Sequence, residues 1–167
     1  MTIQIGDRLP EGTLQEFIDV ETEGCALGPN TFNVSDLVKG KTIAIFGLPG
    51  AFTPTCSAQH LPGYVQLADQ LKAKGVDEIW CISVNDAFVM GAWGREQKAG
   101  GKVRMMADGS ALFTKALGLD MDLTARGMGV RSQRYSMLVE DGTVKAVNVE
   151  APGKFEVSDA DTMLKQA

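Results

Sequence analysis

The chain has 167 residues, of which 44% are hydrophobic and 22% charged, and its formal net charge is −5. These values are typical of one globular domain over residues 1–167, which is long enough to bury a core without disulfides or metals. The acidic balance and the lack of a basic stripe argue against a nucleic-acid partner. No apolar run approaches the roughly 18 residues that a membrane span requires, so no membrane partner is expected.

The cysteines and the N-terminal sequence bear on the cellular compartment. The cysteine count of 3 is odd, and no CxxC spacing occurs, which does not fit a secreted disulfide framework. Residues 1–7 lack the charged and apolar regions of a signal peptide. We therefore expect a reducing compartment and predict a cytoplasmic protein, with prior removal of a transit peptide left open.

The N-terminal part of the chain predicts strands and one short helix. Weak apolar alternation over 13–20 predicts an edge strand, glycines and a proline over 24–30 predict a loop, and 31–34 predicts the return strand. Residues 35–40 predict one capped helical turn that ends at glycine. The apolar run over 41–47 predicts a buried strand.

The middle of the chain alternates between helices and strands. Its apolar periodicity predicts, in order, a helix over 53–74, a strand over 76–84, a helix over 87–98 capped by Asn85 or Asp86, a strand over 103–107 and a helix over 111–117. Pro62 and Gly63 are expected to bend or break the first helix. Ser110 is expected to cap the last helix and Gly118 to end it.

The C-terminal part predicts an antiparallel pair of strands. Residues 119–129 are interpreted as a flexible connector. Strands over 135–140 and 143–149 are joined by Asp141-Gly142, which is typical of a two-residue hairpin turn. A final helix is expected to begin near residues 158–161. The order of elements predicts an α/β fold built on an open sheet.

The segment that follows the 41–47 strand is the main candidate for chemistry. Thr53 suits the N-cap of the next helix, Pro54 its first position, and Cys56 then falls at the third position. Free N–H groups and the positive end of the helix dipole favour a thiolate there, and the thiolate is the nucleophile. The alternative is that Cys56 is an inert core residue, as buried cysteines usually are.

The same segment resembles the active-site motif of the peroxiredoxins, Pro49-x-x-x-Thr53-x-x-Cys56. Longer strings resemble the type II subfamily, namely Pro49-Gly-Ala-Phe-Thr-Pro-Thr-Cys56, His60-Leu-Pro-Gly63, Ser83-Val-Asn-Asp86-Ala-Phe-Val-Met90 and Arg134-Tyr-Ser-Met137. The resemblance implies a thioredoxin-like fold with a central mixed β-sheet flanked by helices. It also implies a cofactor-free thiol peroxidase that reduces hydrogen peroxide and alkyl hydroperoxides through a cysteine sulfenic acid.

A peroxidase cysteine needs donors for the negative charge that develops on the peroxide oxygens. The Thr53 hydroxyl and the amides of the helix start are candidate donors. A guanidinium would complete this set of donors. The resemblance implies that it comes from Arg134, which directly precedes a strand, with Arg131 as the second choice and Arg126 as the third. It gives Pro49 the role of shielding the sulfur from water and from overoxidation.

His60 is the only histidine and lies four residues after Cys56, on the same helix face. A Cys–His protease pair is conceivable, but no third orienting group is identifiable. The spacings match no zinc ligand pattern, so no metal is expected. We interpret His60 and Arg131 as residues that support the peroxidase site.

After reaction with peroxide, the Cys56 sulfenic acid must be reduced, and a second cysteine could do this by forming a disulfide with it. Cys81 lies in an apolar strand and is best interpreted as a core residue, although plant-like type II relatives carry a cysteine at this spacing that is sometimes assigned as resolving. Animal relatives place the resolving cysteine near the C-terminus, where residues 153–158 of this chain contain none. Cys25 could be glutathionylated or idle. The resemblance favours recycling by glutathione and glutaredoxin, with thioredoxin as second choice.

Two further hypotheses concern interactions. The chain could instead be a redox-sensing module that switches a partner when Cys56 is oxidised. The family commonly forms homodimers through loops around the active site, so a homodimer is expected. Its candidate apolar contacts are Phe52, Phe88, Met90 and Trp93.

Overall fold

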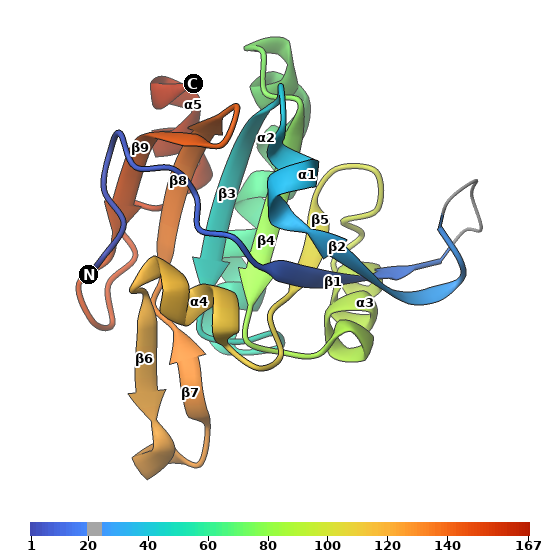
Figure 1. The fold of residues 1–167 in the computed structure, drawn as a ribbon. Helices are drawn as coiled ribbons and strands as arrows, with labels where there is room; N and C mark the ends of the chain where they lie inside the picture. Colours follow the sequence, from blue (N-terminus) through green and yellow to red (C-terminus); the bar gives the residue numbers. More distant parts are fainter. Residues whose placement is uncertain (20–24) are drawn as a thin grey trace.

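The computed structural model describes residues 1–19 and 25–167, and its centre is a seven-stranded sheet with the order β2-β1-β5-β4-β3-β8-β9 (Figure 1). The strands are β1 (Thr13–Ile18), β2 (Gly28–Asn33), β3 (Thr42–Leu48), β4 (Glu78–Ser83), β5 (Arg104–Ala107), β8 (Tyr135–Glu140) and β9 (Thr143–Val149). β3, β4 and β5 run parallel, and every other pairing in this sheet is antiparallel. The predicted α/β sheet of mixed direction is confirmed.

Helices cover both faces of the sheet. They are α1 (Val34–Val38), α2 (Leu61–Ala73), α3 (Ala87–Glu96), α4 (Leu112–Leu117) and α5 (Ala160–Gln166), with a π-helix η1 (Cys56–His60) and a 3-10 helix η2 (Thr124–Arg126). Among the described residues, no helix combines the length and the apolar character needed to cross a membrane.

Each face of the sheet has its own hydrophobic cluster. Side chains alternate along β3, so Phe46 and Leu48 join the cluster under α2, α3 and α5, while Ile43 and Ile45 join the cluster under α1 and α4. Cys56 belongs to the first cluster, and no part of its surface is exposed. The candidate nucleophile is therefore packed between the sheet and the α2 layer.

Several predicted elements are confirmed with their caps. The strands expected around 41–47, 76–84 and 103–107 are present as β3, β4 and β5. Asp86 caps α3 by accepting a hydrogen bond from the Val89 amide at 2.9 Å. Asp141 and Gly142 have φ values of +48° and +80°, as expected of the tight turn between β8 and β9.

The first hairpin differs from its prediction. β1 is not an edge strand, because it pairs with β5 on one side and with β2 on the other. The edge is β2, which begins at Gly28, inside the segment predicted as a loop. Pro29 is tolerated there because the outer side of an edge strand needs no N–H donor. The predicted positions Val20 and Gly24 lie outside the described residues.

The predicted connector over 119–129 was wrong. This region contains β6 (Asp120–Leu123) and, after η2, β7 (Gly129–Ser132), which pair as an antiparallel hairpin that projects beyond the main sheet (Figure 1). The two strands are only four residues long each and polar at several positions. β6 alternates polar and apolar residues (Asp120-Met121-Asp122-Leu123), a strand signal that the connector interpretation did not use.

The start of α4 is also different from its prediction. Ser110 does not cap this helix; the Asp108 carboxylate does, accepting from the Phe113 amide at 3.2 Å and the Thr114 amide at 2.7 Å. The predicted end is confirmed, because Gly118 adopts a left-handed φ of +72°. Ser110 is not in the capping position, because the helix begins at Leu112 and Ala111 is its N-cap residue, with a left-handed φ of +60°.

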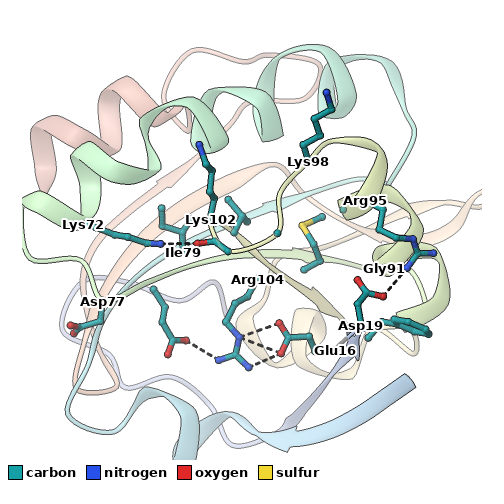
Figure 2. A pocket seen from close by; sticks show the side chains of 17 residues that line it. Glu16, Asp19, Lys72, Asp77, Ile79, Gly91, Arg95, Lys98, Lys102 and Arg104 are labelled. Atoms are coloured by element: carbon teal, nitrogen blue, oxygen red, sulfur yellow. Dashed lines mark hydrogen bonds and ion pairs between the residues drawn. The ribbon is translucent and has the colours of Figure 1, made fainter. Parts of the chain in front are cut away.

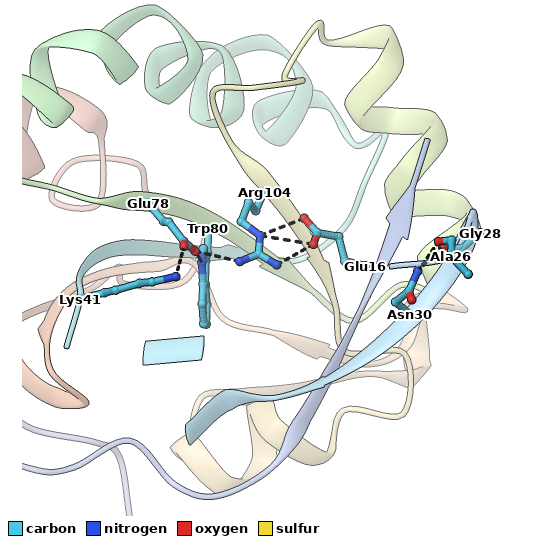
Figure 3. Close-up of polar contacts among 8 residues, drawn as sticks. All are labelled: Glu16, Ala26, Gly28, Asn30, Lys41, Glu78, Trp80 and Arg104. Carbon is cyan, nitrogen blue, oxygen red and sulfur yellow. Dashed lines mark hydrogen bonds and ion pairs between the residues drawn. The ribbon is translucent and has the colours of Figure 1, made fainter. Parts of the chain in front are cut away.

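Charged side chains join the N-terminal ends of the parallel strands (Figure 3). Arg104 of β5 donates to Glu16 of β1 at 2.7 Å and to Glu78 of β4 at 2.8 Å, and Lys41 lies 2.6 Å from Glu78. Burial opposes ionisation of Glu78, but hydrogen bonds from Lys41, Trp80 and Arg104 outweigh it and lower its pKa to about 2. This network lies at the opposite end of the sheet from Cys56, which follows the C-terminal end of β3.

We predict that Gly47→Ala destabilises the fold. Gly47 lies opposite Tyr135 in the β3–β8 pairing, and a Cβ there would overlap the tyrosine ring. Overpacking of this kind costs about 1–3 kcal/mol, which urea unfolding would measure. The matched control is Gly100→Ala, whose Cβ meets no heavy atom within 4 Å. Equal unfolding free energies for the two variants would contradict the prediction.

Candidate active site

The candidate nucleophile lies where β3 ends and the following helix begins. Pro54 and Thr55 are the first helical residues, the π-helix Cys56–His60 follows, and α2 begins at Leu61. Pro62 does not break the helix, because helical backbone runs without interruption over 54–73; the change from π-helix to α-helix comes just before it, and Pro62 lies in the first turn of α2. π-Helical turns occur frequently at functional sites.

Thr53 precedes the helix as predicted, but its side chain does not cap it. The Thr53 hydroxyl donates to the Gly50 carbonyl at 2.7 Å, and the Thr53 carbonyl accepts from the Ser57 amide at 2.9 Å. Because its proton is used by Gly50, the Thr53 hydroxyl oxygen is left to act as an acceptor. The expected donation from Thr53 to the sulfur is therefore absent from this arrangement.

Arg134 is the arginine that the fold brings to Cys56. It directly precedes β8, which pairs with β3 so that Gly47 faces Tyr135. This register places the guanidinium beside the helix start, where Arg134 Nη2 donates to Cys56 Sγ at 3.2 Å. The guanidinium is permanently charged, so the buried sulfur has a fixed cation as its hydrogen-bond donor.

His60 connects this guanidinium to the C-terminal part of the chain. Arg134 Nη1 lies 2.9 Å from His60 Nδ1, and His60 Nε2 lies 3.0 Å from the Ser158 carbonyl oxygen. A carbonyl only accepts, so Nε2 carries the hydrogen and Nδ1 accepts from Arg134. Burial, followed by the charge of Arg134, lowers the pKa of His60 to about 3. His60 is thus a neutral residue that orients Arg134.

The other candidate arginines lie elsewhere. Arg131 donates to the Met128 carbonyl at 2.9 Å and to the Val84 carbonyl at 3.3 Å, so it supports the loop beside Gly50 and does not contact the sulfur. Arg126 is exposed in the β6–β7 hairpin.

The three cysteines are all free. Cys81 is fully buried in β4, next to Phe46 of β3, and shares the apolar cluster of Cys56. Burial, followed by the negative charge on Cys56, raises the pKa of Cys81 well above its ordinary value. Cys81 therefore remains a protonated thiol inside the core. Cys25 is half-buried near the first hairpin.

The predicted interface residues divide into two kinds. Met90 and Trp93 are fully buried, and the Trp93 indole donates to Ser57 Oγ at 3.0 Å, so neither is available for contact with another chain. Phe52 and Phe88 remain exposed, by 52% and 64%. Helical periodicity could not separate these pairs, because all four residues are apolar.

Three supporting residues were not predicted from the sequence. The Asn85 side-chain oxygen accepts from the Ala51 amide at 3.0 Å and holds the loop before the cysteine. The Phe155 ring centre lies 5.8 Å from the Arg134 guanidinium carbon. The Glu150 amide donates to the Arg134 carbonyl at 2.9 Å. Asn85 lies inside the Ser83–Met90 string that resembles the type II subfamily, and Glu150 directly follows β9, but none of the quoted motifs contains Glu150 or Phe155.

The large cavity in Figure 2 is separate from this site. It measures about 670 Å³ and is lined by residues at the N-terminal ends of β4 and β5 and at the ends of α2 and α3. Cys56, Thr53 and Arg134 are not among its lining residues, and the Arg104 guanidinium at its floor is already paired with Glu16 and Glu78.

Comparison with known proteins agrees on one family. Residues 4–164 match the Redoxin family. Peroxiredoxin-2B of Arabidopsis thaliana is 47% identical over 163 residues, covering 98% of this chain and 97% of that protein. Reduced Prx3 of Vibrio vulnificus in complex with H2O2 is 53% identical, with a TM-score of 0.90 and 98% of both chains covered. A Burkholderia cenocepacia protein, provisionally named a thioredoxin reductase, is 67% identical with a TM-score of 0.98, covering 99% of this chain and 98% of that one.

We predict that His60 makes the fold sensitive to mild acid. Its pKa is lowered from 6.5 to about 3 in the folded chain, so the unfolded chain binds a proton first as the pH falls. Stability is therefore lost below pH 6.5, by about 2 kcal/mol between pH 7.5 and 5. Urea unfolding should show this loss in the wild type and not in His60→Gln. Parallel pH profiles for the two proteins would count against it.

Proposed function

This chain belongs to the Redoxin family as a peroxiredoxin, and hence is a thiol peroxidase with a thioredoxin-like fold, and we propose that Cys56 is the sulfur that reduces the peroxide. The observation that carries the proposal is the contact of 3.2 Å between Arg134 Nη2 and Cys56 Sγ. It supplies a fixed cation to a buried sulfur, which is what a thiolate nucleophile requires.

The proposed reaction follows from this geometry. The Cys56 thiolate attacks one oxygen of the hydroperoxide, the S–O bond forms as the O–O bond breaks, and the sulfur becomes a sulfenic acid. The other oxygen leaves as hydroxide or alkoxide and takes up one proton, which balances the proton that the thiol lost on forming the thiolate, to give water or an alcohol. Arg134 is fixed where negative charge moves from sulfur to oxygen, so it stabilises the transition state without reorganisation.

Thr53 and Pro49 complete the proposed site. Because the Thr53 hydroxyl donates to Gly50, its oxygen is suited to accept the O–H of the incoming hydroperoxide and so orient it. Pro49 lies at the end of β3, in the loop that leads to Cys56, and has no N–H to attract water. Since Cys56 is fully buried, small hydroperoxides such as hydrogen peroxide and short alkyl hydroperoxides are the proposed substrates.

For the reductive half of the cycle we propose recycling by an external thiol. Cys81 is buried and held protonated, which disfavours it as a resolving residue. Glutathione would attack the sulfenic acid, releasing water and leaving a mixed disulfide on Cys56, and glutaredoxin would then reduce that disulfide. Thioredoxin is the alternative reductant. A cytoplasmic location would supply either system.

We predict that Cys56→Ser keeps the fold and loses peroxide consumption, because the serine hydroxyl is not ionised at neutral pH. Cys81→Ala should retain turnover with glutathione and glutaredoxin. Both are measured by following hydrogen peroxide with each reductant system in turn. Activity in Cys56→Ser would assign the nucleophile elsewhere. Consumption of only one peroxide per chain, whichever reductant is supplied, would favour the redox-sensor hypothesis.

We also propose a homodimer that uses the exposed apolar surface near the active site. Phe52 follows Pro49 by three residues, and Phe88 begins α3 close to Phe17, at a ring separation of 6.0 Å. Exposed aromatic residues of this size are typical of protein interfaces.

The prediction for this surface is that Phe88→Glu weakens self-association by at least about tenfold, because a charge would be buried in the contact. Sedimentation equilibrium measures the dissociation constant. Ile5→Glu is the matched control, since Ile5 is 66% exposed and lies beside β9 on the other side of the sheet. An unchanged dissociation constant in Phe88→Glu would place the interface elsewhere.

A further inference from the structure

The Glu150 carboxylate accepts more hydrogen bonds than is usual for a charged side chain at the surface. Glu150 follows β9 directly and is only 6% exposed. Its two oxygens accept from the amides of Glu156, Val157 and Ser158 at 2.8–2.9 Å and from the Ser158 hydroxyl at 2.7 Å. Burial opposes its ionisation, but these hydrogen bonds outweigh burial and lower the pKa of Glu150. A fixed anion therefore holds the 156–158 segment.

The segment held in this way carries an acceptor that faces the active site. The Ser158 carbonyl oxygen accepts from His60 Nε2 at 3.0 Å and from the Tyr64 hydroxyl at 3.1 Å. Both donors are buried, so the position of this carbonyl fixes which nitrogen of His60 carries the hydrogen. A displaced carbonyl would release His60 to rotate or to change its tautomer.

His60 passes this constraint to the reacting atoms. Its unprotonated Nδ1 accepts from Arg134 Nη1 at 2.9 Å, and this bond turns the other guanidinium nitrogen toward Cys56 Sγ. The same C-terminal segment places the Phe155 ring against both groups, 5.0 Å from the His60 ring centre and 5.8 Å from the guanidinium carbon. The Glu150 amide also holds the Arg134 backbone, as described above.

We propose that Glu150 is a positioning residue for peroxide reduction. Its carboxylate fixes the 156–158 segment, the Ser158 carbonyl fixes His60, and His60 fixes Arg134 against the Cys56 sulfur. Glu150 itself touches neither sulfur nor peroxide. This inference rests on the proposed function of Cys56 and extends the site to a part of the chain about 95 residues away from it in sequence.

The test compares Glu150→Gln with Glu156→Gln. Glutamine keeps the size of Glu150 but turns an NH₂ group toward the amide donors, so the segment loses part of its anchor. Glu156→Gln removes the same charge from the same segment, where the side chain is exposed and only the backbone is used. Arg134→Gln is the reference variant, because it removes the guanidinium and shows how large the effect is when its contact with Cys56 is lost completely.

The readout is the rate at which iodoacetamide alkylates Cys56, followed on the Cys56 peptide by mass spectrometry from pH 5 to 10. At pH 6 we expect Cys56 of Glu150→Gln to be alkylated about tenfold more slowly than that of the wild type. Near pH 10 the two alkylation rates should be equal, because a thiol ionises there without a neighbouring cation. kcat/KM for hydrogen peroxide should fall by about the same factor. Glu156→Gln should match the wild type in both measurements.

Three outcomes would overturn the proposal. They are a wild-type pH profile in Glu150→Gln, a slowing that is equal at every pH, and an equal effect in Glu156→Gln. Should Glu150→Gln fail to fold, Ser158→Ala, which removes one donor to the same carboxylate, must show a smaller shift in the same direction. Alkylation does not require turnover, so loss of the peroxidase proposal would appear separately, as a wild type that consumes no peroxide.

Discussion

The contact between the Arg134 guanidinium and the Cys56 sulfur is the interaction on which the rest of the site depends. Both groups come from elements that meet only because β8 pairs with β3, so the sheet itself sets the distance of 3.2 Å. Cys81, in the same cluster, accepts no such hydrogen bond within the described part of the chain, and burial raises its pKa.

The two ends of the sheet differ in how their charged side chains are paired. At the N-terminal ends of β4 and β5, Arg104, Glu16, Glu78 and Lys41 form a network whose charges are matched among themselves, so it stabilises the sheet and leaves no free charge for chemistry. At the other end, Arg134 faces a sulfur and a neutral histidine, with no carboxylate among its side-chain partners in the described part of the chain. The positive charge there stays available to a reacting anion.

Local chemistry was the part of the site that could be predicted from the sequence. Thr53, Pro54 and Cys56 are close in the chain, and the strand that begins after Arg134 was visible as an apolar run. The links through Ser158 and Glu150 could not be predicted, because they depend on the path of a loop that has no regular spacing. The β6–β7 hairpin was missed for a different reason, since the alternation in β6 covers only four residues and is followed by glycines that favour a loop. Asp108 replaced Ser110 as a cap because the helix begins one residue later than predicted, after Ala111 at the N-cap.

The full burial of Cys56 has a consequence for the size of the molecules that meet it. In the folded chain the sulfur has no exposed surface, so a molecule as large as a tripeptide or a protein does not reach it. The backbone of the turn Cys56–His60 is held by wider i→i+5 bonds, as in the bond from the Leu61 amide to the Cys56 carbonyl. Unwinding this turn would carry the Cys56 sulfur outward, into reach of molecules that the folded chain keeps away from it.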